Sequence, residues 1–122
     1  DKLDKLGFGE VNVDYLYNLP DTGLKFLSDD LSKLKSFSPT SIDCHPLKYI
    51  SCSTYMLRQI VENKMMIPDA ELRIAMYQYI RAWAIDNNYI EQFADQYSKN
   101  SLANTNIYMK HLYEWMVEVD VL

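Results

Sequence analysis

The residues of this chain that could do chemistry are few, and the most suggestive of them lie in the stretch DCHPLKYISC. Cys44, His45 and Cys52 are residue types that bind zinc, and a cysteine beside a histidine can also act as a nucleophile. A structural zinc site takes four ligands at familiar spacings, whereas this stretch supplies fewer and no C-x-x-C pair occurs elsewhere. A Cys44–Cys52 disulfide would require an oxidising compartment. We therefore predict no metal site, no cofactor and two reduced thiols.

The remaining candidates for acid–base chemistry are equally sparse. His111 precedes Glu114 and Glu118 by three and seven positions, which is typical of a solvated helix edge. The sequence contains no glycine-rich phosphate loop, no H-E-x-x-H or G-x-S-x-G motif and no EF-hand loop. We therefore predict no catalytic residues and a protein that is not an enzyme. No motif assigns the chain to a known family.

Composition narrows the partners and the setting of the chain. Among its 122 residues, 17 are acidic and 12 are lysine or arginine, which gives a net charge of -5. This balance disfavours the phosphate backbone of nucleic acids as a ligand. The sequence has neither an apolar run long enough to cross a membrane nor an apolar signal core at DKLDKLGFGE. We therefore expect an intracellular protein, either cytoplasmic or nuclear.

Apolar periodicity and capping residues predict mostly helices. The expected helices cover residues 22–36, 47–63, 69–87, about 89–97, and the chain from about 105 onward. The stretch SFSPTSIDCHP, residues 36–46, contains two prolines and is expected to be the longest loop. Residues 10–18 remain ambiguous, because their apolar residues fit the period of a strand and that of a helix almost equally well.

These elements predict an all-α fold, a single compact bundle of five or six helices with room for one short N-terminal strand or extended segment. We expect residues 1–122 to form a single helical domain, with residues 1–20 as an extended N-terminal arm. The chain begins with Asp rather than Met, which indicates a fragment of a larger protein.

The helix expected over residues 69–87 carries apolar residues on two sides. One arc should form the core and consists of Leu72, Ala75, Met76, Tyr79, Ile80 and Trp83. The nearly opposite side carries a second stripe, made of Ile74, Tyr77, Arg81 and Ile85. Either the helix is central and buries both sides, or the second stripe is exposed and binds a partner, because tyrosine, tryptophan and arginine are enriched at interface hot spots.

The predicted function is therefore a non-enzymatic protein–protein interaction domain, either an adaptor or a viral domain that binds a host partner. It would dock a peptide or amphipathic helix on Ile74, Tyr77, Arg81 and Ile85, or on Trp115 of the last helix. A basic partner would suit the acidic chain. The alternatives are a nucleic-acid-associated module that uses Arg58, Lys64, Arg73 and Arg81, and a self-associating structural domain. A metal-dependent enzyme that uses Cys44, His45 and Cys52 comes last.

Overall fold

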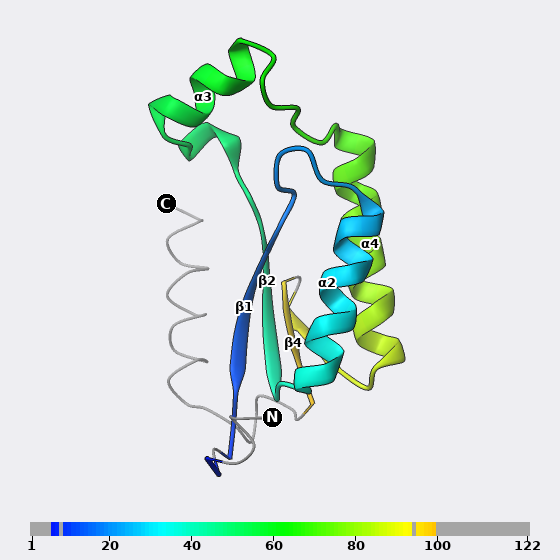
Figure 1. Cartoon of the computed structure of the whole chain (residues 1–122). Coiled ribbons are helices and arrows are strands. Elements are labelled where there is room, and N and C mark those ends of the chain that lie inside the picture. Colours follow the sequence, from blue (N-terminus) through cyan, green and yellow to red (C-terminus); the bar gives the residue numbers. More distant parts are fainter. Residues whose placement is uncertain (1–5, 8, 94, 100–122) are drawn as a thin grey trace, which may run out of the picture.

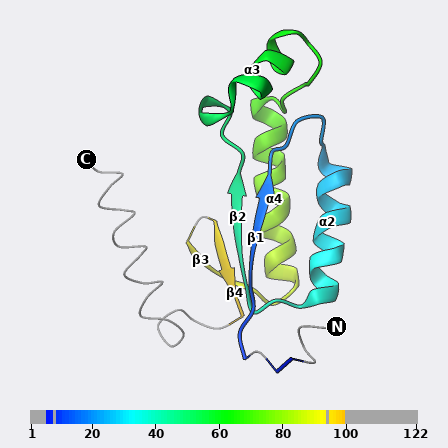
Figure 2. The ribbon, with the colours of Figure 1, turned by 60° about the vertical axis from the view of Figure 1, so that its left-hand side comes forward.

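The computed structural model describes residues 6, 7, 9–93 and 95–99, and these residues form a mixed sheet with two long helices against one of its faces (Figure 1, Figure 2). The elements in chain order are β1 (Asn12–Tyr17), α2 (Leu24–Phe37), β2 (Ser41–Pro46), the 3-10 helix η1 (Tyr49–Ser51), α3 (Thr54–Val61), α4 (Ala70–Asp86), β3 (Ile90–Phe93) and β4 (Gln96–Ser98).

The four strands lie in the order β1-β2-β4-β3, so β1 and β3 are the two edges of the sheet. Strand β1 runs parallel to β2, with Asn12 opposite Ser41 and Tyr17 opposite Pro46. The 14 residues of α2 provide the crossover that a parallel pair requires. Strands β3 and β4 form an antiparallel hairpin, and β4 pairs antiparallel with β2. The sheet therefore joins a parallel βαβ unit to a hairpin.

The hydrophobic core lies between the sheet and the helices α2 and α4, which pack side by side on the same face (Figure 1, Figure 2). Its buried residues are Tyr17, Leu27, Leu31, Leu34, Ile42, Cys44, Met76, Ile80, Ala84, Tyr89 and Tyr97. In α2 they recur at steps of four and three, and in β2 they recur at a step of two, as the two periodicities require. Every element that packs here thus contributes one apolar face.

Local signals explain where the two long helices begin and end. The Asp69 carboxylate accepts a hydrogen bond from the Leu72 backbone N–H at 2.7 Å and so caps the start of α4. Asn88, just past the end of α4, has a φ of 65°, the left-handed conformation that asparagine tolerates. Ser38 takes the same conformation after α2, where its N–H reaches the Leu34 and Lys35 carbonyls. The expectations for helices near 22–36 and 69–87 are therefore confirmed.

The expected all-α bundle is wrong, because two segments that were assigned to a loop and a helix form strands of the sheet. Residues 36–46 contain β2, a central strand in which buried Ile42 and Cys44 alternate with more exposed neighbours. The apolar part of this strand is only two residues long and prolines flank it, so its local composition resembles a loop. For residues 10–18 the strand alternative is the correct one.

The segment near residues 89–97 forms the hairpin of β3 and β4 and not a helix. Ile90, Ala94 and Tyr97 are spaced four and three apart, which fits one helix face, but no apolar periodicity distinguishes so short a segment from a strand pair. The helix expected over 47–63 is reduced to η1 and α3, and α3 begins where the Ser53 hydroxyl caps the Met56 N–H. The helix expected from about residue 105 lies outside the described residues.

No helix in the described part of the chain combines the length and the hydropathy needed to cross a bilayer.

Leu31 is fully buried beneath the sheet, and we expect its replacement to destabilise the fold strongly. Leu31→Ala should lower the free energy of unfolding by about 2–5 kcal/mol, because it removes buried methyl groups and leaves a cavity. Urea denaturation followed by circular dichroism measures this loss. Leu24→Ala, at an exposed position in the same helix, is the matched control and should cost clearly less. Equal losses in the two variants would contradict the packing described.

Candidate functional site

The side chains that alternate with the core point to the opposite side of the sheet and form a polar face. This polar face consists of Asn12 and Asp14 of β1, Ser41, Asp43 and His45 of β2, and Gln96 of β4. Both α2 and α4 lie against the other side of the sheet (Figure 2). A sheet with one face on the core and one face outside reads as apolar and polar residues in alternation. Here the outer positions carry carboxylate, imidazole, hydroxyl and amide groups, which can form hydrogen bonds to a ligand.

Three of these groups lie close together on the neighbouring parallel strands. Asp14 of β1 pairs directly with Asp43 of β2, and His45 follows two residues later on the same side of β2. One ligand atom from each of the three side chains lies within 4.8 Å of the other two. We call this set the Asp–Asp–His cluster. Two carboxylates and an imidazole in this arrangement can bind a cation or accept hydrogen bonds from a ligand.

The amide of Asn12 bridges the two carboxylates. Its Nδ2 donates to Asp43 Oδ2 at 3.2 Å and to Asp14 Oδ1 at 3.4 Å. The Ser41 hydroxyl donates to Asn12 Oδ1 at 2.7 Å and thereby fixes the orientation of that amide. The cluster is therefore held by a second layer of hydrogen bonds that come from its own two strands.

Two buried oxygen atoms on the polar face lack a hydrogen-bond donor in the described part of the chain. They are Asp43 Oδ1 and Gln96 Oε1. Gln96 is only 6% exposed, and it lies directly opposite Asp43 in the antiparallel ladder of β2 and β4, so both side chains are on the same side of the sheet. A buried polar atom without a partner costs about 1–3 kcal/mol. Two such atoms thus lie at or beside the cluster, and two more, Asn18 Oδ1 and Tyr97 Oη, lie elsewhere in the described part of the chain.

Cys44 and His45 cannot contribute to one metal site, because successive strand residues point to opposite sides of the sheet. Cys44 is buried in the core whereas His45 is exposed. Burial raises the pKa of the Cys44 thiol to about 12, and the nearby Asp95 and Asp43 add to this effect. The thiol is therefore protonated at neutral pH and is a poor nucleophile. The metal-dependent enzyme built on Cys44, His45 and Cys52 does not fit this geometry.

Burial also raises the pKa of the Asp95 carboxyl, while the positive charges of His45 and Lys48 lower it in part. His45 is thus exposed beside three acidic residues, the two of the cluster and Asp95. Negative charge is therefore concentrated around this imidazole.

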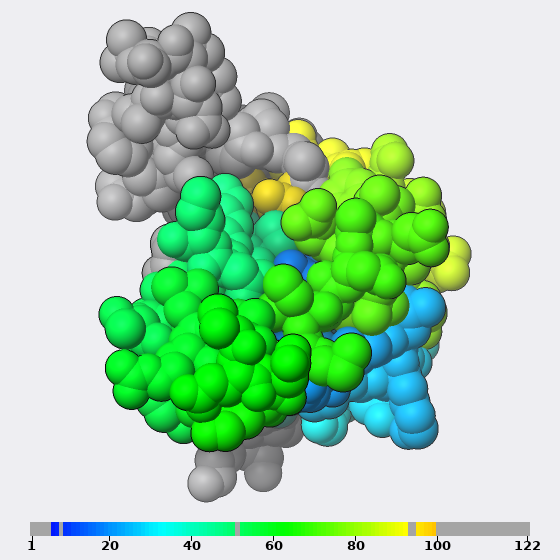
Figure 3. Space-filling view, turned by 90° about the horizontal axis from the view of Figure 1, so that it is seen from above, coloured from blue at the N-terminus to red at the C-terminus, as the bar shows by residue number. Residues whose placement is uncertain are grey.

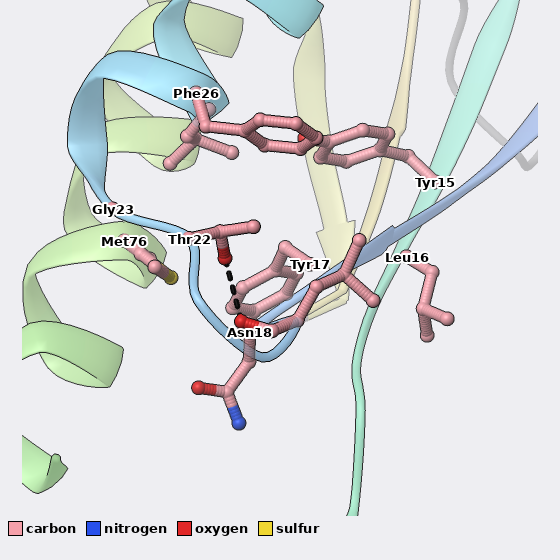
Figure 4. A pocket seen from close by; sticks show the side chains of 10 residues that line it. Tyr15, Leu16, Tyr17, Asn18, Thr22, Gly23, Phe26 and Met76 are labelled. Atoms are coloured by element: carbon pink, nitrogen blue, oxygen red, sulfur yellow. Dashed lines mark hydrogen bonds between the residues drawn. The ribbon is translucent and has the colours of Figure 1, made fainter. Parts of the chain in front are cut away.

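A largely apolar hollow of about 440 Å³ opens where β1 and β2 end. It is lined by Leu16, Pro46, Leu47, Lys48, Cys52, Ser53 and Met56. Leu16 lies two residues after Asp14, and Pro46 directly follows His45, so the hollow adjoins the polar face. A ligand with one polar and one apolar end could span the two. A second hollow, between β1 and α2, measures only about 10 Å³ (Figure 4). It has room for no more than a water molecule.

The segment that borders the larger hollow exposes much apolar surface. None of the residues of α3 is buried, and Ile50 of η1 is 96% exposed. Figure 3 looks down on this end of the molecule and shows the green α3 segment at the surface. The hollow is thus bounded on one side by the sheet and on the other by a weakly packed helix.

The residues predicted to bind a partner lie along one side of α4, and the structure gives them different surroundings. Ile74 and Ile85 are 54% and 57% exposed. Tyr77 is half-buried and lines a hollow of about 250 Å³ together with Ile74. Arg81 is tied to β3, because its Nε lies 2.9 Å from Glu91 Oε2. Trp115 lies outside the described residues.

The arc that was predicted to form the core of this helix is buried at Met76 and Ile80, and Leu72 and Trp83 pack against it partly exposed. Tyr79 is more exposed than expected, and its hydroxyl donates to Ser28 Oγ of α2 at 3.0 Å. This bond links the two helices at the surface.

Two of the four cations proposed for nucleic acid already have acidic partners. Lys64 pairs with Glu62 at 2.8 Å, and Arg81 pairs with Glu91. The remaining two, Arg58 and Arg73, belong to different helices.

Sequence reasoning missed Asp14, Asp43 and Gln96 as site residues. The segments NVDYLY and SIDCHP each alternate polar and less polar residues, and this shared alternation is the local signal of two strands with one polar side. The pairing of residue 14 with residue 43 depends on the register of the two strands, and no local sequence pattern predicts that register.

The fold and this site define an α/β chain with a mixed sheet and a polar face opposite its helices. No family model matches the chain, and no curated protein matches it. A solved structure with the same fold is coproporphyrinogen III oxidase (HemN) from Escherichia coli, described as a radical SAM enzyme. The TM-score is 0.65 at 17% sequence identity, and the match covers 79% of this chain and 22% of the oxidase. A likeness at this identity establishes the shared fold.

Asp14→Asn should stabilise the chain when no metal is present, because like charges directly opposite each other in a sheet repel. We expect a gain of about 0.2–1 kcal/mol in the free energy of unfolding, measured by urea denaturation at pH 7 with a chelator. Asn retains an oxygen that can accept the bond from Asn12. The control Asp29→Asn removes an exposed ion pair with Lys25 and should have little or a slightly negative effect. A clear loss of stability in Asp14→Asn would show that the two carboxylates do not repel.

Proposed function

We propose that this chain is a ligand-binding segment of an enzyme of the radical SAM type, and that its polar face is turned toward the bound ligand. The observation that carries the proposal is the gathering of Asp14, Asp43 and His45 on the side of the sheet opposite the helices. The fold shared with a segment of coproporphyrinogen III oxidase supports an enzyme domain as the context. The chain spans 22% of that oxidase, so a longer protein would supply the rest of the domain.

The position of the hollow of about 440 Å³ also supports this function. In open α/β sheets, ligands bind outside the carboxyl ends of the parallel strands. Here the hollow is lined by Leu16 and Pro46, at the carboxyl ends of β1 and β2, and by Met56 of α3. The hollow therefore occupies the position where this architecture binds ligands, and the polar face adjoins it.

S-adenosylmethionine is the candidate ligand, because the neighbouring structure is described as a radical SAM enzyme. Its ammonium and ribose hydroxyl groups are donors that suit the carboxylates of Asp14 and Asp43, and its adenine suits the apolar hollow. The buried acceptors Asp43 Oδ1 and Gln96 Oε1 fit a ligand that carries donors. The radical chemistry that the class name denotes would come from the cofactor, whereas the residues of this chain would bind and orient it. An intracellular setting is part of this proposal, and the two free thiols suit it.

Titration of the isotope-labelled chain with S-adenosylmethionine, in the presence of a chelator, tests this proposal by nuclear magnetic resonance. We expect chemical-shift changes to concentrate at residues 12–16, 41–48 and 96. Asp14→Ala should weaken binding by about tenfold or more, because hydrogen bonds to charged groups contribute about 1.5–3 kcal/mol. Asp29→Ala, an exposed acidic residue of α2, is the matched control and should bind like the unaltered chain. The proposal fails if shifts spread over α2 and α4 instead, or if Asp14→Ala binds normally.

A second candidate is the docking of another protein on the exposed side of α4. It is favoured by Ile74 and Ile85, two large apolar side chains that are more than half exposed, and by the hollow beside Ile74 and Tyr77. Because the chain carries a net charge of -5, a basic peptide or amphipathic helix is the natural partner. In this case the chain would act as a non-enzymatic interaction domain.

Affinity capture from the native host separates this candidate from an enzyme segment. We expect a specific partner to be retained by the unaltered chain and lost with Ile74→Asp and with Tyr77→Ala, because anchors at an interface centre cost about 2 kcal/mol or more when truncated. Ile50→Asp, at an exposed apolar position outside α4, is the control and should still capture the partner. Capture that persists in both α4 variants would count against this surface.

A further inference from the structure

Neither carboxylate of the Asp–Asp–His cluster forms an ion pair with a lysine or arginine in the described part of the chain. Asp14 and Asp43 are direct neighbours in the parallel ladder, where like charges destabilise a sheet. The ion pairs between described residues are Lys25–Asp29, Lys33–Asp30, Lys64–Glu62 and Arg81–Glu91, and none of them includes Asp14 or Asp43. In the described part of the chain, the neutral amide of Asn12 donates to both carboxylates. The arrangement has a concentrated negative charge that a bound cation would balance.

The burial of the neighbouring Gln96 is an independent observation that also indicates a bound cation. Its side chain is 94% buried, and its Oε1 has no donor in the described part of the chain. It faces Asp43, whose Oδ1 is also buried and without a donor. Water-to-protein transfer of such oxygens is unfavourable unless they are bonded or coordinate a metal. A cation between them would satisfy both oxygens at once.

We infer that Asp14, Asp43 and His45 form a binding site for a divalent first-row transition-metal ion, with the amide oxygen of Gln96 beside it. Atoms that share a metal ion at about 2.1 Å lie no more than about 4.2 Å apart. The ligand atoms of the cluster lie within 4.8 Å of one another, so small rotations of the exposed Asp14 and His45 side chains bring them into range. Asn12, which donates to both carboxylates, acts as a positioning residue.

The donor set selects the kind of metal. Imidazole nitrogen favours zinc, iron and related ions, whereas carboxylate and amide oxygens also accept manganese. No sulfur contributes, because Cys44 points to the opposite face. Magnesium and calcium prefer oxygen ligands alone and should bind more weakly. Three or four protein ligands leave coordination positions for water or a substrate, as in catalytic metal sites. This site shares Asp14 and Asp43 with the proposed S-adenosylmethionine site, so the two ligands would compete for these carboxylates, and metal binding does not require S-adenosylmethionine.

Isothermal titration of the chelator-treated 122-residue chain with Zn²⁺ and with Mn²⁺ tests the inference in the absence of S-adenosylmethionine. We expect one ion per chain, with Zn²⁺ bound more tightly than Mn²⁺ and Mg²⁺ bound least. His45→Ala and Asp43→Asn should each weaken Zn²⁺ binding by at least about tenfold. His45 is exposed and Asp43→Asn keeps its shape, so both variants should fold, which circular dichroism verifies.

Two control variants separate this site from other metal-binding side chains. His111→Ala removes the other histidine of the chain, and Cys52→Ser removes the partly exposed thiol. Both should bind Zn²⁺ like the unaltered chain. Loss of binding in either control, with normal binding in His45→Ala, would overturn the inference.

Paramagnetic broadening by Mn²⁺ locates the ion independently of affinity. We expect amide signals of residues 12–14, 43–45 and 96 to broaden first, and signals of α2 and α4 to broaden later. Broadening centred elsewhere would overturn the inference, as would the absence of any saturable binding. Because the S-adenosylmethionine titration contains a chelator and this one contains no S-adenosylmethionine, failure of one proposal is distinguishable from failure of the other.

Discussion

The parallel pairing of β1 with β2 is the constraint on which the rest of the structure depends. Its register places Tyr15 opposite Cys44 on the core side and Asp14 opposite Asp43 on the other side. A shift of one residue would exchange the two sides, because successive side chains of a strand alternate. The core and the polar face are therefore two results of the same set of backbone hydrogen bonds. Helix α2 makes this pairing accessible, since a parallel neighbour requires a crossover of about this length.

Because both long helices lie on one side of the sheet, its apolar residues and its polar residues are on opposite sides. Leu31, Ile42, Ile80 and Tyr97 meet between α2, α4 and the sheet, and the energy of burial is concentrated there. Burial also raises the pKa of the Cys44 thiol and of the Tyr97 hydroxyl, so the ionisable groups of the core stay neutral at physiological pH. Groups that can carry charge and meet a ligand lie on the opposite side. The free energy gained by burial in the core can therefore offset the cost of placing the carboxylates of Asp14 and Asp43 side by side.

The sequence was sufficient to predict α2 and α4, because capping residues and a sustained helical period mark both of them. It was insufficient for β2, whose two buried residues are too few for a periodic signal and whose flanking prolines resemble a loop. The hairpin of β3 and β4 was missed because Ile90 and Tyr97 also fit a helical spacing. The cluster could not have been found locally at all, since Asp14 and Asp43 are separated by 29 positions and the whole of α2. By contrast, helical periodicity alone predicts that Ile74 and Ile85 lie on the same side of α4, because this arrangement does not depend on what the helix packs against.

Within the described part of the chain, β1 lies at the border of the sheet, and this position bears on association between copies. A border strand presents a row of unpaired N–H and C=O groups that another copy of the chain could use as a template for aggregation. Natural sheets counter this hazard with charged side chains on such strands, and Asp14 lies in the middle of β1. Two copies that added strand to strand there would bring further acidic groups together. The Asp14 carboxylate would thus oppose the strand-to-strand association of two copies.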